Sequence, residues 1–251
     1  MKPITGIVIT LNEAYNISEC LISLSKVCDE LIVVDSGSDD KTVEIAEAYG
    51  AKIYTQNYLG DGPQKAFGVP YAKNDWILSL DADERLSEDA VSIIKTLELG
   101  DPQIAYCFHR KNYVGEHWIK AAGFYPDSVV RLYNRTTSGY LNKKAHSSVK
   151  APSICQTKTH IEHLTYRDLS DWVSRINVLS TRDAWAMKES GKKPFFFNPI
   201  LHSANAFIRK LIFKGGLFQG ADGFLVAITT AFHAYMKYAK LNELYKKTTS
   251  K

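Results

Sequence analysis

The first hundred residues alternate between short continuous apolar runs and longer segments in which apolar residues recur every three or four positions. Continuous apolar runs bounded by polar residues predict buried strands of the kind that parallel sheets contain. Recurrence at helical spacing predicts helices that bury one face. The runs predict strands over residues 6–11, 31–34 and 76–80, and residues 52–55 are predicted as a short third strand in chain order.

A predicted helix follows each of these strands. The helices are marked by Ile17, Cys20, Leu21 and Leu24, by Val43, Ala46 and Tyr49, by a segment before Pro70, and by Val91, Ile94 and Leu97 between an N-cap at Ser87 and a stop at Gly100. Residues 4–100 therefore repeat the order strand–helix, which predicts a parallel sheet with helices on both faces. In such sheets, functional loops lie beyond the carboxyl ends of the strands.

The second half of the chain is less regular. Residues 104–110 and 129–135 are predicted strands, and residues 169–188, 200–213 and 224–245 are predicted helices. Basic residues flank the last two helices, a pattern that suits packing on the sheet, dimerisation or an anionic membrane surface. The predicted division is an α/β half over 1–100, a second half of the same domain over 101–167, and a helical extension over 168–251.

Composition adds limits to this architecture. The 251 residues are 45% apolar and carry a formal net charge of +4, so a large core is expected and no nucleic-acid partner is predicted. The four cysteines form no C-x-x-C pair, which favours a reducing cytoplasm. The sequence shows no signal-peptide pattern and no apolar stretch near the ~20 residues of a membrane span. Neither G-x-G-x-x-G nor a P-loop motif follows the first strand.

Three carboxylates end the fourth predicted strand. Residues 76–86 read W-I-L-S-L-D-A-D-E-R-L, which places Asp81, Asp83 and Glu84 within four positions. Carboxylates this close repel one another, so something cationic is expected beside them. Mg²⁺ and Mn²⁺ prefer oxygen ligands and commonly arrive bound to phosphate. The alternative is an acidic turn that holds no metal.

Three stretches of this sequence together resemble the family 2 glycosyltransferases. They read I-V-I-T-L-N-E, L-I-V-V-D-S-G-S-D-D-K-T and W-I-L-S-L-D-A-D-E. The similarity is greatest to small bacterial enzymes that add sugars to the lipopolysaccharide core, of the β-1,4-glucosyltransferase kind. It continues more loosely through Arg131-Leu132-Tyr133 and the segment around His163. The resemblance implies an α/β fold of the GT-A type, with a mostly parallel sheet flanked by helices and a helical C-terminal extension.

The resemblance also implies an activity. We expect inverting transfer of a hexose from a nucleotide-diphosphate donor, a UDP-hexose, to a saccharide acceptor of lipopolysaccharide or a related cell-surface glycan, with Mg²⁺ or Mn²⁺ as cofactor. The acceptor is expected to be lipid-linked. The chain is then expected in the cytoplasm, peripheral on the cytoplasmic face of the inner membrane, with a homo-oligomer left open.

Individual positions match the family pattern at the ends of the first, second and fourth strands. The residues implied to contact the nucleotide-sugar there are Thr10, Leu11, Asn12, Glu13, Asp35, Ser36, Asp81 and Ala82. Lys65, in a Q-K pair, is implied to reach phosphate, although its position alone equally suits a solvated helix lysine.

The D-x-D motif, with Asp81 and Asp83, is implied to hold the metal ion, and the late His163 to complete its site. A packed histidine is the alternative for His163. His160 is not expected to share an ion with His163, because residues three apart on a strand face opposite sides.

The catalytic base departs from the family pattern. Inverting transfer needs a group that takes the proton of the acceptor hydroxyl. The family pattern has Glu just after V-H, whereas this chain has Ser147 after His146. The candidates are His146, which equally suits a structural role, and Asp127, for which the family pattern rather implies a role in positioning other groups. The alternative to an enzyme is therefore a nucleotide-sugar-binding protein with weak or lost transfer activity.

Overall fold

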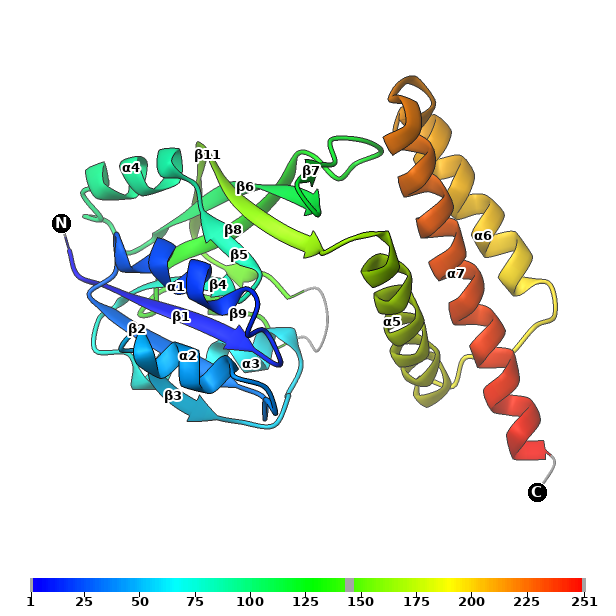
Figure 1. Ribbon diagram of the computed structural model, residues 1–251, viewed down its shortest axis with the longest axis horizontal. Helices are drawn as coiled ribbons and strands as arrows, with labels where there is room; N and C mark the ends of the chain where they lie inside the picture. The colour runs from blue at the N-terminus through cyan, green and yellow to red at the C-terminus, as the bar shows by residue number, and fades with distance from the viewer. Residues whose placement is uncertain (1, 143–146, 250–251) are drawn as a thin grey trace. The chain divides into compact units, whose positions relative to one another are not determined.

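A computed structural model describes residues 2–142 and 147–249. The chain forms two compact units, and Figure 1 shows the course of the chain through both. The first unit comprises Met1–Lys111 and Asp127–Leu164, and the second comprises Asn112–Pro126 and Thr165–Lys251. The three-part division expected from the sequence stays a prediction.

The first unit is built on a mixed sheet whose strand order is β3-β2-β1-β4-β8-β6-β11-β5. The strands are β1 (Ile4–Thr10), β2 (Glu30–Asp35), β3 (Lys52–Thr55), β4 (Trp76–Asp81), β5 (Glu84–Leu86), β6 (Ile104–Val114), β8 (Asp127–Asn134) and β11 (Ser153–Tyr166). The four strands β3, β2, β1 and β4 are parallel, and β8 is the first to run antiparallel. The short β7 (His117–Trp118) pairs with β6, and β9 (Gly139–Tyr140) pairs with β10 (Val149–Lys150).

Helices cover both faces of the parallel strands. They are α1 (Ile17–Ser25), α2 (Thr42–Ala48), α3 (Asp61–Phe67), the 3-10 turn η1 (Val69–Tyr71) and α4 (Glu88–Thr96). Alternate residues of β1 separate the two cores: Val8 packs in a cluster with α1 and α4, whereas Ile7 packs in a second cluster with residues of α3 and η1.

The predicted order of strands and helices over residues 4–100 is confirmed. Helix α4 ends at Thr96, before the expected stop at Gly100, because Leu97 already has an extended backbone. The strand β5, which begins at Glu84, was not predicted, since three residues are too few to show a pattern.

The second unit consists mainly of helices. They are α5 (Leu169–Glu189), α6 (Asn198–Ile208), the π-helical turn η2 (Arg209–Phe213), the 3-10 turn η3 (Gly216–Phe218) and α7 (Gly220–Thr249). Helices α6 and α7 run alongside each other (Figure 1). Their junction needs glycine, because a Cβ on Gly223 would lie 1.8 Å from the carbonyl oxygen of Gly216. No helix in the described ranges is long and apolar enough to cross a membrane.

Candidate active site

The carboxyl ends of β1, β2 and β4 meet at one edge of the sheet. Thr10 pairs with Asp35 of β2, and Ile9 pairs with Asp81 of β4. Parallel pairing in this register places the polar residues that follow each strand side by side. The structure thus brings the residues predicted to contact the nucleotide, which are far apart in sequence, to a common edge.

The loops after β1 and β2 are held together by hydrogen bonds. The Asn12 backbone N–H donates to Ser38 Oγ, and its side-chain oxygen accepts from the Asp39 N–H, both at 2.9 Å. Asn12 has a φ of 55°, in the left-handed region that asparagine tolerates. The Glu13 backbone N–H donates to Thr42 Oγ1 at 2.8 Å. The two loops therefore form one supported surface.

Asp35 shapes its own loop. Its buried carboxylate accepts the backbone N–H groups of Gly37 and Ser38, each at 2.9 Å, and also the Ser38 hydroxyl. Ser36 Oγ accepts from Gln64 Nε2 at 3.1 Å, which ties this loop to α3. The contacts of Asp35 and Ser36 with a base or ribose stay predictions.

The end of β1 combines a polar and an apolar group that suit a ligand. The Thr10 hydroxyl is buried and has no hydrogen-bond partner in the part of the chain that the structure describes. Leu11, the next residue, is 50% exposed. A buried hydroxyl without a partner is costly, and an exposed apolar side chain beside it offers a surface for a flat ring. Ala82, at the end of β4, is buried and contributes no polar side chain.

Asp81 lies between two cations. Lys65 Nζ is 2.8 Å from Asp81 Oδ1, and Arg131 Nη2 is 2.9 Å from Oδ2. Burial alone would raise the pKa of Asp81, but Lys65 and Arg131 outweigh it and hold that pKa below its ordinary value. Lys65 is itself buried, with its ammonium 5.6 Å from the ring centre of Tyr140. The interpretation of Lys65 as a solvated helix lysine is therefore wrong.

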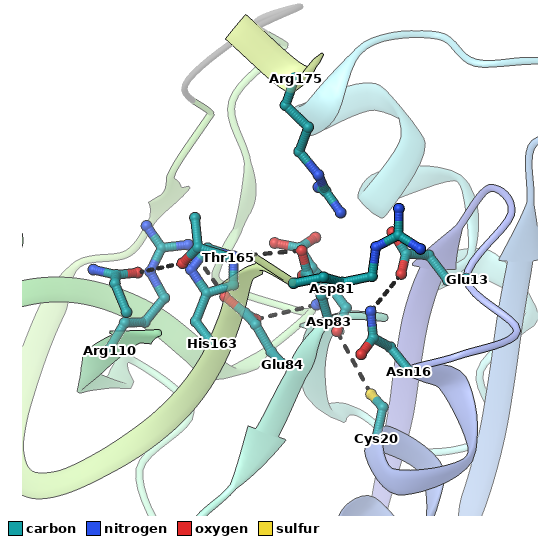
Figure 2. Close-up of polar contacts among 12 residues, drawn as sticks. Glu13, Asn16, Cys20, Asp81, Asp83, Glu84, Arg110, His163, Thr165 and Arg175 are labelled. Carbon is teal, nitrogen blue, oxygen red and sulfur yellow. Dashed lines mark hydrogen bonds and ion pairs between the residues drawn. The ribbon is translucent and has the colours of Figure 1, made fainter. Parts of the chain in front are cut away.

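We call the charged side chains gathered at the end of β4 the charged cluster: Asp81, Asp83, Glu84, Lys65, Arg110, Arg131 and His163. Glu84 is its most deeply buried carboxylate, with no exposed surface. Its oxygens contact Arg131 Nη2 and, at 3.2 Å, Arg110 Nη1, and they accept the backbone N–H of Asp81 at 3.1 Å. Burial would raise the pKa of Glu84, but the Arg131 guanidinium lowers it below its usual value. Figure 2 shows Glu84 beside Asp81, Asp83 and Arg110. The chain's own cations thus supply part of the positive charge that the acidic stretch was expected to need.

Asp83 faces a histidine from a distant strand. The antiparallel register of β5 and β11 places His163 opposite Glu84, and His163 Nε2 then lies 3.5 Å from Asp83 Oδ2 (Figure 2). Burial alone would lower the pKa of His163, but the neighbouring Asp83 raises it above its usual value. His160 instead pairs with Asp89, at 3.1 Å. The two histidines therefore pair with different carboxylates.

The donor set around Asp83 fits a divalent ion that has few protein ligands. Asp83 and His163 are partly exposed and adjacent, and they present a carboxylate oxygen and an imidazole nitrogen. Residues 2–142 and 147–249 contain no group of three or more His, Cys, Asp or Glu placed to hold a metal. Mg²⁺ sites of this kind use one or two carboxylates and take other ligands from water and substrate phosphate. The fit therefore depends on a phosphate-bearing ligand.

The candidate bases differ in what the structure says of them. Asp127, at the start of β8, contacts Arg110 at 2.7 Å from Nη2 and 2.9 Å from Nε. His146 lies outside the described residues. The neighbouring Ser147 donates its hydroxyl to the Leu141 carbonyl at 2.8 Å. A Cβ on Gly62 would lie 2.3 Å from both atoms, so this segment packs closely against the start of α3.

Residues 5–160 match the model of glycosyl transferase family 2, which is more than half of the chain. The chain belongs to glycosyltransferase family 2. It is 32% identical to an uncharacterized glycosyltransferase of Rickettsia bellii over 97% of this chain and 87% of that protein. It is 28% identical to the lipopolysaccharide core biosynthesis glycosyltransferase LpsC of Rhizobium meliloti, over 95% of this chain and 92% of that protein. The GT-A type fold expected from the family is confirmed.

The chain also resembles part of one solved structure. That structure is glucosyl-3-phosphoglycerate synthase from Mycobacterium tuberculosis in complex with Mn²⁺, UDP and glucosyl-3-phosphoglycerate. The identity is 25%, over 45% of this chain and 44% of that chain, with a TM-score of 0.35.

Three residues of the charged cluster had no predicted role: Glu84, Arg110 and Arg131. Arg131 stands in the R-L-Y stretch where the family resemblance continues, so the pattern marked the position without its contacts. Arg131 reaches Glu84 from 47 positions away. A long-range pairing of this kind follows from the sheet order and leaves no local signal.

Proposed function

We propose that this family 2 member catalyses metal-dependent, inverting transfer of a hexose from a nucleotide-diphosphate donor, a UDP-hexose, to a saccharide acceptor. The proposed acceptor is a lipid-linked saccharide of lipopolysaccharide or a related cell-surface glycan. Support for the acceptor class comes from the Rhizobium meliloti relative, which is named for lipopolysaccharide core biosynthesis and aligns along 95% of this chain. Support for the donor class comes from the residues at the edge of the sheet.

The observation that carries the proposal is the charged cluster at the end of β4. Lys65 and Arg131 hold the Asp81 carboxylate from two sides, and Asp83 lies next to His163. At the same edge of the sheet, the Thr10 hydroxyl at the end of β1 has no partner among the described residues, and Leu11 offers an apolar face. A donor whose base lies at these loops would place its diphosphate at the cluster.

Each residue of the cluster then has a distinct task. Asp83 and His163 would hold the divalent ion, which supplies positive charge where the departing diphosphate becomes more negative. Lys65 is a compact point charge, and its flexible side chain can contact Asp81 and a phosphate together. Arg131 and Glu84 fix the position of Asp81, so the carboxylates do not need to reorganise when the donor binds.

A second candidate function is nucleotide-sugar binding without efficient transfer. The observation that favours it is Ser147, which stands where the family pattern has an acid and whose hydroxyl is bonded to Leu141. A serine cannot take up the proton as a carboxylate does, so turnover would depend on His146 or Asp127.

A donor panel separates the two functions. Purified protein is incubated with UDP-, GDP-, ADP- and dTDP-hexoses in Mn²⁺, in Mg²⁺ or in EDTA, and release of nucleoside diphosphate is followed. We expect release from a UDP-hexose that requires the metal. Tight donor binding by calorimetry without release, also when lipopolysaccharide core acceptors are added, would establish the binding protein instead. Neither binding nor release with any donor would contradict both candidates.

A further inference from the structure

The second unit exposes an unusual amount of apolar surface over residues 195–218. Ten large apolar side chains in this stretch are exposed, among them Phe196 at 76%, Phe213 at 78% and Phe218 at 88%. Leu201, Ile208 and Ile212 are spaced seven and four positions apart, so they lie on one side of the helix formed by α6 and η2. We call the ten exposed apolar side chains of residues 195–218, together with Lys193, Arg209 and Lys214, the α6–η3 surface.

The charge of the surrounding segment has one sign. Residues 190–221 contain five Lys or Arg and no Asp or Glu. The next acid, Asp222, is 2.9 Å from His117 Nε2. Burial, Arg209 and Lys214 together lower the pKa of Lys210, as expected where positive charge is not offset. A partner for the α6–η3 surface should therefore be both apolar and anionic.

We infer that the α6–η3 surface docks on an anionic lipid bilayer. The helical stretch over residues 198–213 is ~24 Å long at 1.5 Å per residue, and exposed phenylalanines lie beyond or at both of its ends. Such a helix lies in the plane of the membrane with its apolar side in the acyl region and its basic residues at the headgroups. A second copy of the chain fits less well, because a two-fold contact would bring the same cations together.

This inference does not rest on the proposed sugar transfer. Docking uses residues of the second unit only, whereas donor binding uses residues of the first. Vesicle binding should therefore be the same with and without UDP and Mn²⁺, and either proposal can fail alone.

The test is flotation of the full chain with vesicles of phosphatidylglycerol mixed with phosphatidylcholine, and with phosphatidylcholine alone. We expect binding to the anionic vesicles that weakens as salt is raised. The variant Lys193→Gln/Arg209→Gln/Lys214→Gln should bind on the order of 100-fold more weakly, about fivefold for each basic residue. Its control, Lys73→Gln/Lys95→Gln/Lys158→Gln, removes the same charge from exposed sites of the first unit and should bind within about twofold of the wild type.

A second pair of variants tests the apolar part. Phe213→Ser/Phe218→Ser should weaken vesicle binding by roughly tenfold for each ring, whereas the exposed pair Tyr49→Ser/Ile154→Ser of the first unit should not. Circular dichroism should show the same helix content in all four variants. No flotation of the wild type with anionic vesicles at low salt, or equal flotation of variants and controls, overturns the inference. The inference is also overturned if the wild type does not bind vesicles but sediments as a dimer, and Phe213→Ser/Phe218→Ser abolishes that dimer.

Discussion

In the first unit, charged side chains are buried at the edge of a sheet, namely those of Glu84, Arg131 and Lys65. In the second unit, by contrast, aromatic rings are exposed to solvent, namely those of Phe196, Phe213 and Phe218. Each arrangement reverses the ordinary distribution, in which charge is outside and large apolar groups are inside. Buried charge costs free energy unless it is paired, and exposed rings favour association. The difference matches the two partners proposed above, a small anionic ligand for the first unit and an apolar, anionic surface for the second.

The largest expected effect concerns the catalytic base, the group that takes the proton of the acceptor hydroxyl. If His146 takes the proton, His146→Ala should lower transfer by about 10²–10⁴-fold, with donor affinity almost unchanged. If Asp127 is the base, Asp127→Asn should carry that loss instead. Steady-state transfer rates and donor calorimetry distinguish the two. Full activity in both variants would show that neither residue is the base.

A gain of function sharpens the same point. Ser147→Glu restores the acid of the family pattern and should raise transfer if the native site is a weakened one. Ser148→Glu, which adds the same charge one position later, is the matched control. An equal response of the two variants would mean that the position of the acid has no effect.

The buried cluster should be costly to break. Arg131→Leu leaves Glu84 and Asp81 without their shared guanidinium, and we expect the free energy of unfolding to fall by about 3–5 kcal/mol. Lys26→Met, which removes one partner of the exposed Lys26–Glu88 pair, should cost about 0–1 kcal/mol. Urea unfolding measures both. A similar small loss in the two variants would show that the cluster is no more than an ordinary surface network.

Removing an aromatic ring should lower stability strongly in the first unit and hardly at all in the second. Phe108 in β6 is fully buried, so Phe108→Ala should lower the free energy of unfolding by about 3–5 kcal/mol. Phe218 is 88% exposed, so Phe218→Ala should change the free energy of unfolding by about 0.5 kcal/mol or less. Thermal and urea unfolding provide the comparison. A large loss for Phe218→Ala would mean that its ring supports the fold rather than a partner.

The strands β1, β2 and β4 could be predicted from sequence because each is largely an apolar run, and the helices because their apolar residues recur at helical spacing. The family resemblance marked the D-x-D stretch and the loop after β1 as candidate sites, and their roles stay predictions. The charged cluster could not, because Arg131 and His163 reach Glu84 and Asp83 only through the order and register of β8, β5 and β11. The sequence does not decide between the two interpretations of Lys65 for the same reason, since its burial against Asp81 depends on where α3 packs.

We propose above all that the carboxyl edge of β1, β2 and β4 binds a nucleotide diphosphate through a metal held by Asp83. Calorimetry of UDP binding in Mn²⁺ tests it most directly, with wild type, Asp83→Ala and the exposed control Asp101→Ala compared at equal concentration. The account predicts Mn²⁺-dependent binding by the wild type and by Asp101→Ala, none by Asp83→Ala, and the same unfolding midpoint in all three. Unchanged Mn²⁺-dependent binding by Asp83→Ala would contradict it.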